Sequence, residues 1–223
     1  MMIVNRKHLI LLGTVSLMGL FSACDMLEDV YDDPTVVKQE GQYYVDATDY
    51  AQWVYINLHT PTPTVTTSTI SLDDLSETGA PETWDIAHHR YDVKTNGAAV
   101  MMTPYHSIKE LEAAGLPTEG EWVEDEESDE CITVDMSHMM EGYLVYAPGH
   151  KNPEVGKWVE VDTSSMPPNY AMHDNVMLIR LTDGTYAAIQ LANFMSTDSY
   201  QVKGWMTVNY KYPIAPQPPK GEG

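Results

Sequence analysis

The sequence predicts an all-β fold: one antiparallel β domain that carries a single short helix. Short segments rich in aromatic and β-branched residues follow one another with turn-forming residues between them, as is typical of all-β proteins: residues 43–47, 53–58 and 65–70. Further along, an Asp183-Gly184 pair separates two apolar segments, residues 176–181 and 186–194, which is a strong hairpin signal. One segment carries the start and stop signals of a helix.

The N-terminus has the pattern of a lipoprotein signal. Residues 1–23 contain basic Arg6 and Lys7, an apolar run and two small residues directly before Cys24, as in a secretory signal peptide. A cysteine at the cleavage position predicts that Cys24 becomes acylated. Residues 24–42 are acidic and show little periodicity, so we interpret them as a flexible tether to the folded domain, residues 43–212.

The charge of the mature chain excludes some partners. The sequence has 12 basic and 33 acidic residues, and cleavage removes two of the basic ones, which leaves a formal charge of −23. Nucleic acid is therefore not expected as a partner. Anionic lipid headgroups repel a protein of this charge as well. No apolar run after the signal peptide reaches the ~20 residues of a membrane helix. The sequence predicts membrane attachment through the acyl chains alone.

The run W-D-I-A-H-H-R-Y-D-V-K-T-N-G, residues 84–97, is predicted to form a central strand. A buried guanidinium must find a carboxylate, so Arg90 is expected to pair with Asp85 or Asp92 in a structural role. The Asn-Gly turn signal at the end of the run predicts that residues 98–102 pair back on this strand as a hairpin.

The adjacent His88 and His89 suggest a metal site at first sight. Successive side chains of a strand point to opposite faces, so neighbouring residues cannot ordinarily bind one ion. The apolar face of the run changes near these histidines, which favours a β-bulge. We expect both histidines to be satisfied polar residues rather than ligands.

The predicted helix covers residues 108–114. Ser107 and Glu110 have the spacing of a capping box, and Gly115 supplies a stop signal. The acidic segment 121–130 lacks the alternating ligands and central glycine of a calcium-binding loop, so we interpret it as a solvated loop. Further strands are predicted at residues 131–136, 143–146, 157–162 and 202–210, and a proline-rich disordered tail at 213–223.

Methionines are concentrated beyond residue 130, and several lie in predicted loops. D-M-S-H-M-M-E-G joins the strands 131–136 and 143–146, and S-S-M-P-P-N-Y follows the strand 157–162. Two hairpin ends that each offer a soft thioether can face each other across a flat haem and bind its iron from both sides. Enzyme signatures such as G-x-S-x-G, H-E-x-x-H, a phosphate-binding glycine loop and paired CxxC motifs are absent, and we expect no enzyme activity.

The run at residues 84–97 closely resembles the signature of the HmuY-like haem-binding lipoproteins of anaerobic Gram-negative bacteria. Other landmarks of the resemblance are residues 132–134, Trp158 to Glu160, Tyr170, the Asp183-Gly184 hairpin and the Y-K-Y-P ending at residues 210–213. The resemblance implies the fold of that family. It also implies a haem held between two axial ligands, which are histidines in some members and methionines in others.

The resemblance and the two loops together favour Met139 as the first axial ligand and Met166 as the second. His138 competes with Met139, because imidazole is the commoner haem ligand and spacing cannot separate adjacent positions. Met140 is expected to line the haem face. The residues expected to flank the ring, for which core packing is almost as good an explanation, are Met136, Tyr170 and Met172.

We therefore expect a lipoprotein that takes haem from host haemoproteins and passes it to an outer-membrane receptor. The acidic cluster after Cys24 resembles the surface-export signal of lipoproteins in this bacterial group, which implies a surface-exposed position at the outer membrane. The alternative is a carbohydrate-binding or adhesion module, because 5 Trp and 14 Tyr on a β scaffold offer aromatic faces for sugars. A metal-dependent hydrolase that uses the histidines is a third, weaker interpretation.

Overall fold

The computed structural model describes residues 40–165 and 167–215. All of these belong to one compact unit. The predicted signal peptide, the predicted acylation site Cys24 and nearly all of the predicted tether lie outside the described residues. No helix in the described part of the chain is long and apolar enough to cross a membrane.

Two antiparallel sheets form the body of the fold, which confirms the predicted all-β antiparallel class. The five-stranded sheet has the order β1 (Gln42–Asp46), β15 (Lys203–Lys211), β14 (Tyr186–Met195), β13 (Met177–Arg180) and β8 (Ala99–Met102). The four-stranded sheet has the order β3 (Thr64–Thr67), β2 (Val54–Asn57), β6 (Ile86–His89) and β7 (Asp92–Thr95).

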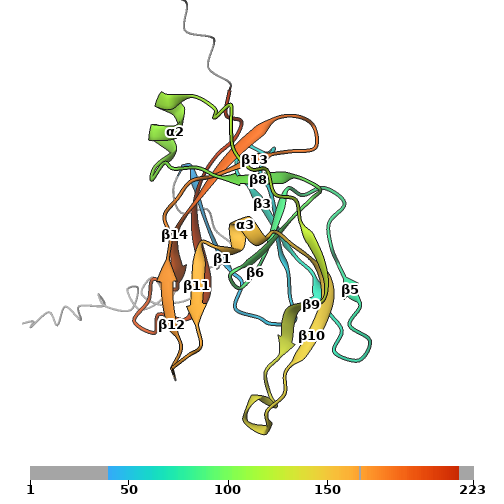
Figure 1. Ribbon diagram of the computed structural model, residues 1–223. Helices are drawn as coiled ribbons and strands as arrows, with labels where there is room; N and C mark the ends of the chain where they lie inside the picture. Colours follow the sequence, from blue (N-terminus) through green and yellow to red (C-terminus); the bar gives the residue numbers. More distant parts are fainter. Residues whose placement is uncertain (1–39, 166, 216–223) are drawn as a thin grey trace, which may run out of the picture. The chain divides into compact units, whose positions relative to one another are not determined.

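Three further pairs of strands form two-stranded ladders of their own. They are β9 (Glu126–Asp135) with β10 (Val145–Lys151), β11 (Val159–Asp162) with β12 (Asn169–Met172), and β4 (Thr69–Ile70) with β5 (Glu77–Thr78). The described helices are α2 (Ile108–Ala114), α3 (Pro153–Gly156) and the 3-10 helix η1 (Met139–Glu141). The β9–β10 and β11–β12 hairpins extend in the same direction from the two large sheets (Figure 1).

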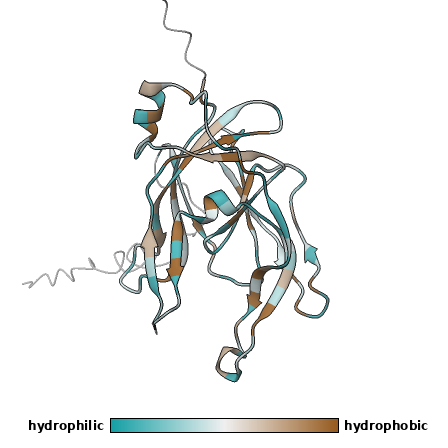
Figure 2. Ribbon diagram, in the orientation of Figure 1, coloured by the Kyte–Doolittle hydropathy of each residue, from teal (hydrophilic) through white to brown (hydrophobic). Residues whose placement is uncertain are grey.

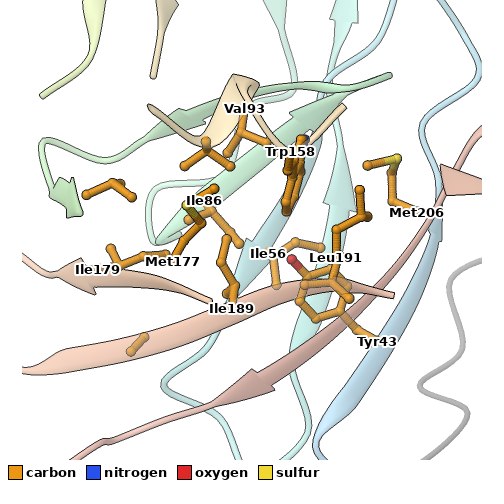
Figure 3. Packing of buried hydrophobic residues seen from close by; sticks show 14 of the residues in the cluster. Tyr43, Ile56, Ile86, Val93, Trp158, Met177, Ile179, Ile189, Leu191 and Met206 are labelled. Atoms are coloured by element: carbon orange, nitrogen blue, oxygen red, sulfur yellow. The ribbon is translucent and has the colours of Figure 1, made fainter. Parts of the chain in front are cut away.

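The main core cluster contains side chains from both large sheets. Alternate residues of a strand share a face, so Ile189 and Leu191 of β14 point together into this core. Ile56 and Ile86 from the four-stranded sheet lie close to them, and Trp158 fills the space beside Ile86 (Figure 3). All five side chains are at most 1% exposed. The packing of these side chains therefore holds the two sheets together.

Helix α2 and the hairpin at Asp183-Gly184 form as predicted. The Ser107 hydroxyl caps α2 by accepting a hydrogen bond from the Glu110 backbone amide, and Gly115 ends the helix with a φ of 85°. The β13–β14 hairpin turns at Asp183 and Gly184, where Gly184 has a φ of 84°. The Thr185 backbone amide donates to the Asp183 carboxylate and stabilises this turn.

The prediction of one central strand over residues 84–97 is wrong. The chain reverses within this run, and β6 and β7 form a hairpin on either side of Arg90, which has a left-handed φ of 51°. The predicted pairing of residues 98–102 with this run is also wrong. These residues form β8, which pairs with β13 in the five-stranded sheet, so the Asn96-Gly97 turn carries the chain from one sheet to the other.

The acidic segment 121–130 is only partly the solvated loop that was predicted. Its last five residues, Glu126 to Glu130, extend β9 with exposed side chains, because β10 supplies a partner strand. Asp125 accepts hydrogen bonds from the backbone amide and the hydroxyl of Thr95, and from the Asn152 side chain. Burial raises the pKa of the Asp125 carboxyl.

The folded chain continues past β15. Ile214 is buried against α2 and the β13–β14 hairpin residues, and its backbone amide donates to the Tyr186 carbonyl. The folded part of the chain therefore includes Ile214 from the segment predicted as a tail, whereas residues 216–223 lie outside the described residues.

Candidate functional site

Exposed hydrophobic side chains are concentrated on the two hairpins that extend from the body of the fold. Nine large hydrophobic residues are exposed in the described chain, and six of them lie on these hairpins. The β9–β10 hairpin carries Met139, Met140, Tyr143 and Tyr146, and the β11–β12 hairpin carries Val161 and Met172. Figure 2 shows hydrophobic residues along both hairpins. An apolar surface of this kind marks a binding site for an apolar ligand or partner.

Helix α3 connects the two hairpins and fixes their bases. The Asn152 side chain caps α3 by accepting hydrogen bonds from the backbone amides of Glu154 and Val155, both at 3.1 Å, and the proline at the first position favours a helix start. Directly after the helix, the buried Trp158 donates from Nε1 to the Tyr91 carbonyl. The two hairpins are thus joined by one helical turn that is anchored in the core.

One face of β11–β12 continues the core outward. Val159 lies opposite Met172 and Val161 opposite Tyr170, so these four side chains share one face. Val159 is buried, Tyr170 is half-buried, and Val161 and Met172 are 38% and 41% exposed. The other face carries Glu160 and Asp162, which are both exposed. The hairpin is therefore apolar toward the core and polar toward solvent.

Tyr170 packs in an aromatic cluster. Its ring centroid lies 5.8 Å from that of Tyr91, in the turn between β6 and β7, and 5.9 Å from that of Phe194 on β14. Tyr91 and Phe194 also contact each other edge to face. Burial raises the pKa of Tyr91 to about 12, so its hydroxyl stays neutral at physiological pH. The cluster supports the face of β11–β12 described above.

The tip between β9 and β10 brings the first group of predicted ligands together. Met139 and Met140 lie in η1, where they are 44% and 91% exposed, and Met136 is half-buried just after β9. His138 stacks on Tyr143 with a centroid distance of 4.6 Å, and its Nδ1 lies 3.1 Å from Glu141 Oε2. A carboxylate at Nδ1 favours the tautomer in which Nε2 can bind a metal. Met139 and His138 therefore both remain candidates.

The second group of predicted residues lies on the other hairpin. Tyr170 and Met172 are on the apolar face of β12, whereas Met166 lies outside the described residues. Both hairpin tips lie at the same end of the molecular unit (Figure 1). In the described chain, no group of three or more His, Cys, Asp or Glu side chains is arranged to hold a metal ion.

His88 and His89 are buried and each is hydrogen-bonded through Nε2 alone, so the prediction that they are satisfied polar residues is confirmed only in part. Nε2 of His88 lies 2.8 Å from the Tyr43 hydroxyl, and its ring stacks on Trp158 at a centroid distance of 5.6 Å. Burial lowers the pKa of His88 to about 3, which keeps the ring uncharged. His89 donates from Nε2 to the Tyr50 carbonyl, on the opposite face of β6. Nδ1 of each ring has no hydrogen-bond partner among the described residues.

Arg90 does not pair with Asp85 or Asp92, so that prediction is wrong. Its guanidinium donates to the carbonyls of Thr48 at 2.9 Å and Lys203 at 3.2 Å, and it lies 4.3 Å from the ring centroid of Tyr50. The carboxylates are used elsewhere: Asp85 binds the Leu58 amide and His59, and Asp92 pairs with Lys151.

Comparison with known proteins places the chain in a family. The family model described as "HmuY protein" matches residues 49–210. The chain belongs to the HmuY family. That match covers both large sheets from β2 onward and the two hairpins.

Several solved structures share the fold. A candidate lipoprotein of Bacteroides fragilis NCTC 9343 is 44% identical, with 82% of this chain and 95% of that chain covered and a TM-score of 0.71. A candidate HmuY-like haem-binding protein of Bacteroides vulgatus ATCC 8482 is 42% identical, with 78% and 92% covered and a TM-score of 0.69. The apo HmuY analog of Tannerella forsythia is 25% identical, with 80% and 97% covered and a TM-score of 0.58. The chain matches no curated protein.

The site of this HmuY-family chain contains residues that sequence reasoning missed. Tyr91 and Phe194 contact Tyr170, and Lys203 places its ammonium 4.8 Å from the centroid of the Tyr170 ring. Tyr91 belongs to the H-H-R-Y-D run that was quoted as a family landmark, so a signal for it existed. Phe194 and Lys203 lie in separate strands far along the chain, and only the register of the five-stranded sheet brings them close to Tyr170.

Proposed function

We propose that this protein binds haem between the β9–β10 and β11–β12 hairpins, as a non-enzymatic surface lipoprotein for haem acquisition. The observation that carries the proposal is the concentration of exposed apolar and thioether side chains on these two hairpins. Membership of the HmuY family, and a solved relative described as a HmuY-like haem-binding protein, support it.

The side chains present fit a haem better than a bare metal ion. A porphyrin brings four equatorial nitrogens to its iron, so the protein needs only one or two axial donors and an apolar surface. The described chain offers no cluster of three metal-binding side chains, which a bare ion would need. It does offer His138, Met139 and Met140 at the tip of the β9–β10 hairpin. The other hairpin offers the apolar face of its strands β11 and β12.

Each residue has a distinct proposed task. Met139 and Met166 supply the axial bonds, and His138 is the competing first donor because its Nδ1 is held by Glu141. Met140 lines the haem face. The remaining residues that flank the ring are Met136, Tyr170 and Met172.

The bound haem is cargo rather than a catalytic group in this proposal. The protein takes haem from host haemoproteins and delivers it to an outer-membrane receptor, while acylation at Cys24 holds it on the cell surface. Ligation by two side chains on separate hairpins suits such a role, because each axial bond can form or break with its own hairpin. This function involves no enzymatic step.

The tryptophans do not favour the sugar-binding alternative, although Tyr143, Tyr146 and Tyr200 are exposed. A sugar platform needs a flat aromatic face that is open to solvent, and none of the 5 Trp residues is exposed. Trp53 and Trp158 are buried, whereas Trp84, Trp122 and Trp205 are half-buried against other side chains.

The first prediction concerns the axial ligands. Haemin titrated into the mature chain should give a saturable Soret change, and Met139→Ala and Met166→Ala should each change the Soret and Q-band spectrum because each removes one donor. The double variant should lose most binding. Leu72→Ala is the matched control, because Leu72 is an exposed apolar residue, 53% exposed, outside both hairpins.

His138→Ala and Met140→Ala complete the ligand experiment. An unchanged spectrum for Met139→Ala, together with a change for one of these two variants, would move the first ligand by one position. Unchanged spectra for all four single variants would rule out the proposed site. Absence of any saturable Soret change in the wild-type chain would contradict haem binding itself.

A further inference from the structure

Building on the proposed haem-binding function, we propose that Lys203, positioned by Arg90, binds the propionate carboxylates of haem. The haem would then enter with its carboxylate edge toward the aromatic cluster of Tyr91, Tyr170 and Phe194. This assigns an anion subsite to a protein whose overall charge is strongly negative.

Cations are scarce in this protein, and most are neutralised. The described residues include eight Lys and Arg side chains. Four of them form ion pairs with carboxylates: Lys94 with Glu77, Lys151 with Asp92, Lys157 with Glu154, and Lys211 with Glu112. The four without a carboxylate partner in the described chain are Arg90, Lys109, Arg180 and Lys203. Of these, Arg90 donates from its guanidinium to the backbone carbonyl of Lys203.

The ammonium of Lys203 has unused hydrogen-bonding capacity. Its Nζ lies 4.8 Å from the centroid of the Tyr170 ring, and it forms no hydrogen bond or ion pair with another described residue. A lysine ammonium has three N–H donors, and a ring face satisfies them weakly compared with a carboxylate. Lys203 is half-buried at the start of β15.

Arg90 acts as a positioning residue for this ammonium. Its guanidinium donates to the Lys203 carbonyl at 3.2 Å and to the Thr48 carbonyl at 2.9 Å, which ties the start of β15 to the segment after β1. The guanidinium is also 5.5 Å from the Tyr91 ring centroid. The guanidinium thus holds the backbone of Lys203, and neither cation has a carboxylate partner among the described residues, a setting that attracts an anion.

The position of Lys203 selects the propionates as that anion. Tyr170 lies on the apolar face of β11–β12, together with Val161 and Met172, which we assign to the haem. An ammonium that rests on this ring lies at the border of the proposed haem surface. Haem carries its two carboxylates on one edge of an otherwise apolar ring, so a cation at the border of an apolar surface can fix which edge enters.

Ferric haemin and its dimethyl ester separate this inference from the proposed function. The ester has the same ring and iron but no propionate charge. The Lys203→Met variant keeps an unbranched stem against Tyr170 and removes the charge. Its dissociation constant for haemin should rise about tenfold, the range of a charge-assisted hydrogen bond, whereas its affinity for the ester should match wild type. Lys203→Arg should restore haemin binding to within about threefold of wild type.

Lys211→Met is the matched control, since it is the same substitution at the other end of β15, where Lys211 is paired with Glu112. It should leave both affinities unchanged. An equal loss of haemin and ester binding in Lys203→Met would overturn the charge role, and so would wild-type affinity for both ligands. If wild-type protein binds haemin and the ester equally, the subsite is wrong although haem binding stands. If it binds neither, the proposed function and this inference are both wrong.

Discussion

At the scale of single residues, the most informative side chain outside the site is His88. It is completely buried, is held by the Tyr43 hydroxyl and stacks on Trp158. Its pKa of about 3 in the folded protein is far below the ordinary value of 6.5, because charging the ring in the core would require a buried cation without a partner. The unfolded chain has no such restriction.

The second prediction follows from this difference. Between pH 6.5 and about 3 the unfolded chain binds a proton at His88 that the folded protein does not, so the free energy of unfolding falls as the pH falls through this window. At pH 5 the expected loss from His88 is about 2 kcal/mol relative to pH 7.5. Urea unfolding at both pH values measures it.

His88→Phe keeps an aromatic ring against Trp158 and removes the proton, so its unfolding free energy should change less between the two pH values, by about 2 kcal/mol. His150→Phe, at an exposed histidine, is the matched control and should keep the wild-type pH dependence. Identical pH dependence in His88→Phe and wild type would show that His88 is not the group responsible. His89, whose pKa burial also lowers, adds to the wild-type effect in the same direction.

The third prediction concerns the iron donors. A thioether has no proton to gain in this range, whereas imidazole is protonated near pH ~6.5 and then cannot bind iron. With two methionine ligands, haem binding should persist at a mildly acidic pH where the fold is intact. Sulfur also favours ferrous over ferric iron, so binding should tighten on reduction. Haem titrations with and without dithionite, at neutral and acidic pH, measure both effects.

The opposite result would identify His138. Haem release centred near the imidazole pKa, with unchanged circular dichroism and weaker binding of ferrous than ferric haem, would mean that an imidazole is a ligand. The contact between His138 Nδ1 and Glu141 makes it the donor to expect in that case.

At the scale of elements, local signals predicted some structures well. The helix α2 covers residues 108–114, as the cap at Ser107 and the stop at Gly115 predict, because both signals act within a few residues. The Asp183-Gly184 hairpin has the same local origin. Pairing between distant strands has no such signal, which is why β8 was assigned to the wrong partner. Its register with β13 depends on which apolar face reaches the core.

The turn at Arg90 shows another limit of sequence reasoning. The apolar residues over 84–97 predict one strand. The left-handed conformation of Arg90 instead divides the run into two strands of four residues each. Arginine carries no turn signal, and its conformation is stabilised by tertiary contacts with Thr48, Tyr50 and Lys203. For the site, the sequence indicated both hairpin tips, whereas the aromatic and charged residues beneath Tyr170 come from distant strands.

The fourth prediction tests the apolar face of β11–β12 as an element. Val161→Asn places a polar group on this face and should weaken haemin binding about fivefold, because an apolar contact with the ring is lost. The free energy of unfolding should change by less than about 1 kcal/mol, since Val161 is 38% exposed. Haemin titration and urea unfolding give the two quantities.

Glu160→Gln supplies the control on the opposite face of the same strand, where the side chain is exposed. It should leave both quantities at wild-type values. Equal effects of the two substitutions on haemin affinity would mean that the polar and apolar faces of this hairpin are not distinguished by the ligand.

At the scale of the whole molecule, the charge of −23 predicted for the mature chain bears on how the protein would attach to a membrane. Such a chain is repelled by anionic lipids, so the fifth prediction is that acylation alone holds it to the membrane. Cys24→Ala should release the protein into the soluble fraction, which immunoblotting of membrane fractions after a high-salt wash measures. Cys131→Ala, at the buried free cysteine, should stay membrane-bound. Retention of Cys24→Ala protein would contradict the lipid anchor.

The independence of the two hairpin ladders has an evolutionary consequence. β9–β10 and β11–β12 are hydrogen-bonded within themselves and belong to neither large sheet, and the residues at the β9–β10 tip, such as Met140, are surrounded mainly by solvent. Exchange of a side chain there costs little folding free energy. If these residues bind haem as proposed, one amino-acid substitution can replace a thioether by an imidazole, or the reverse, and so change the preference of the same scaffold for the oxidation state of iron.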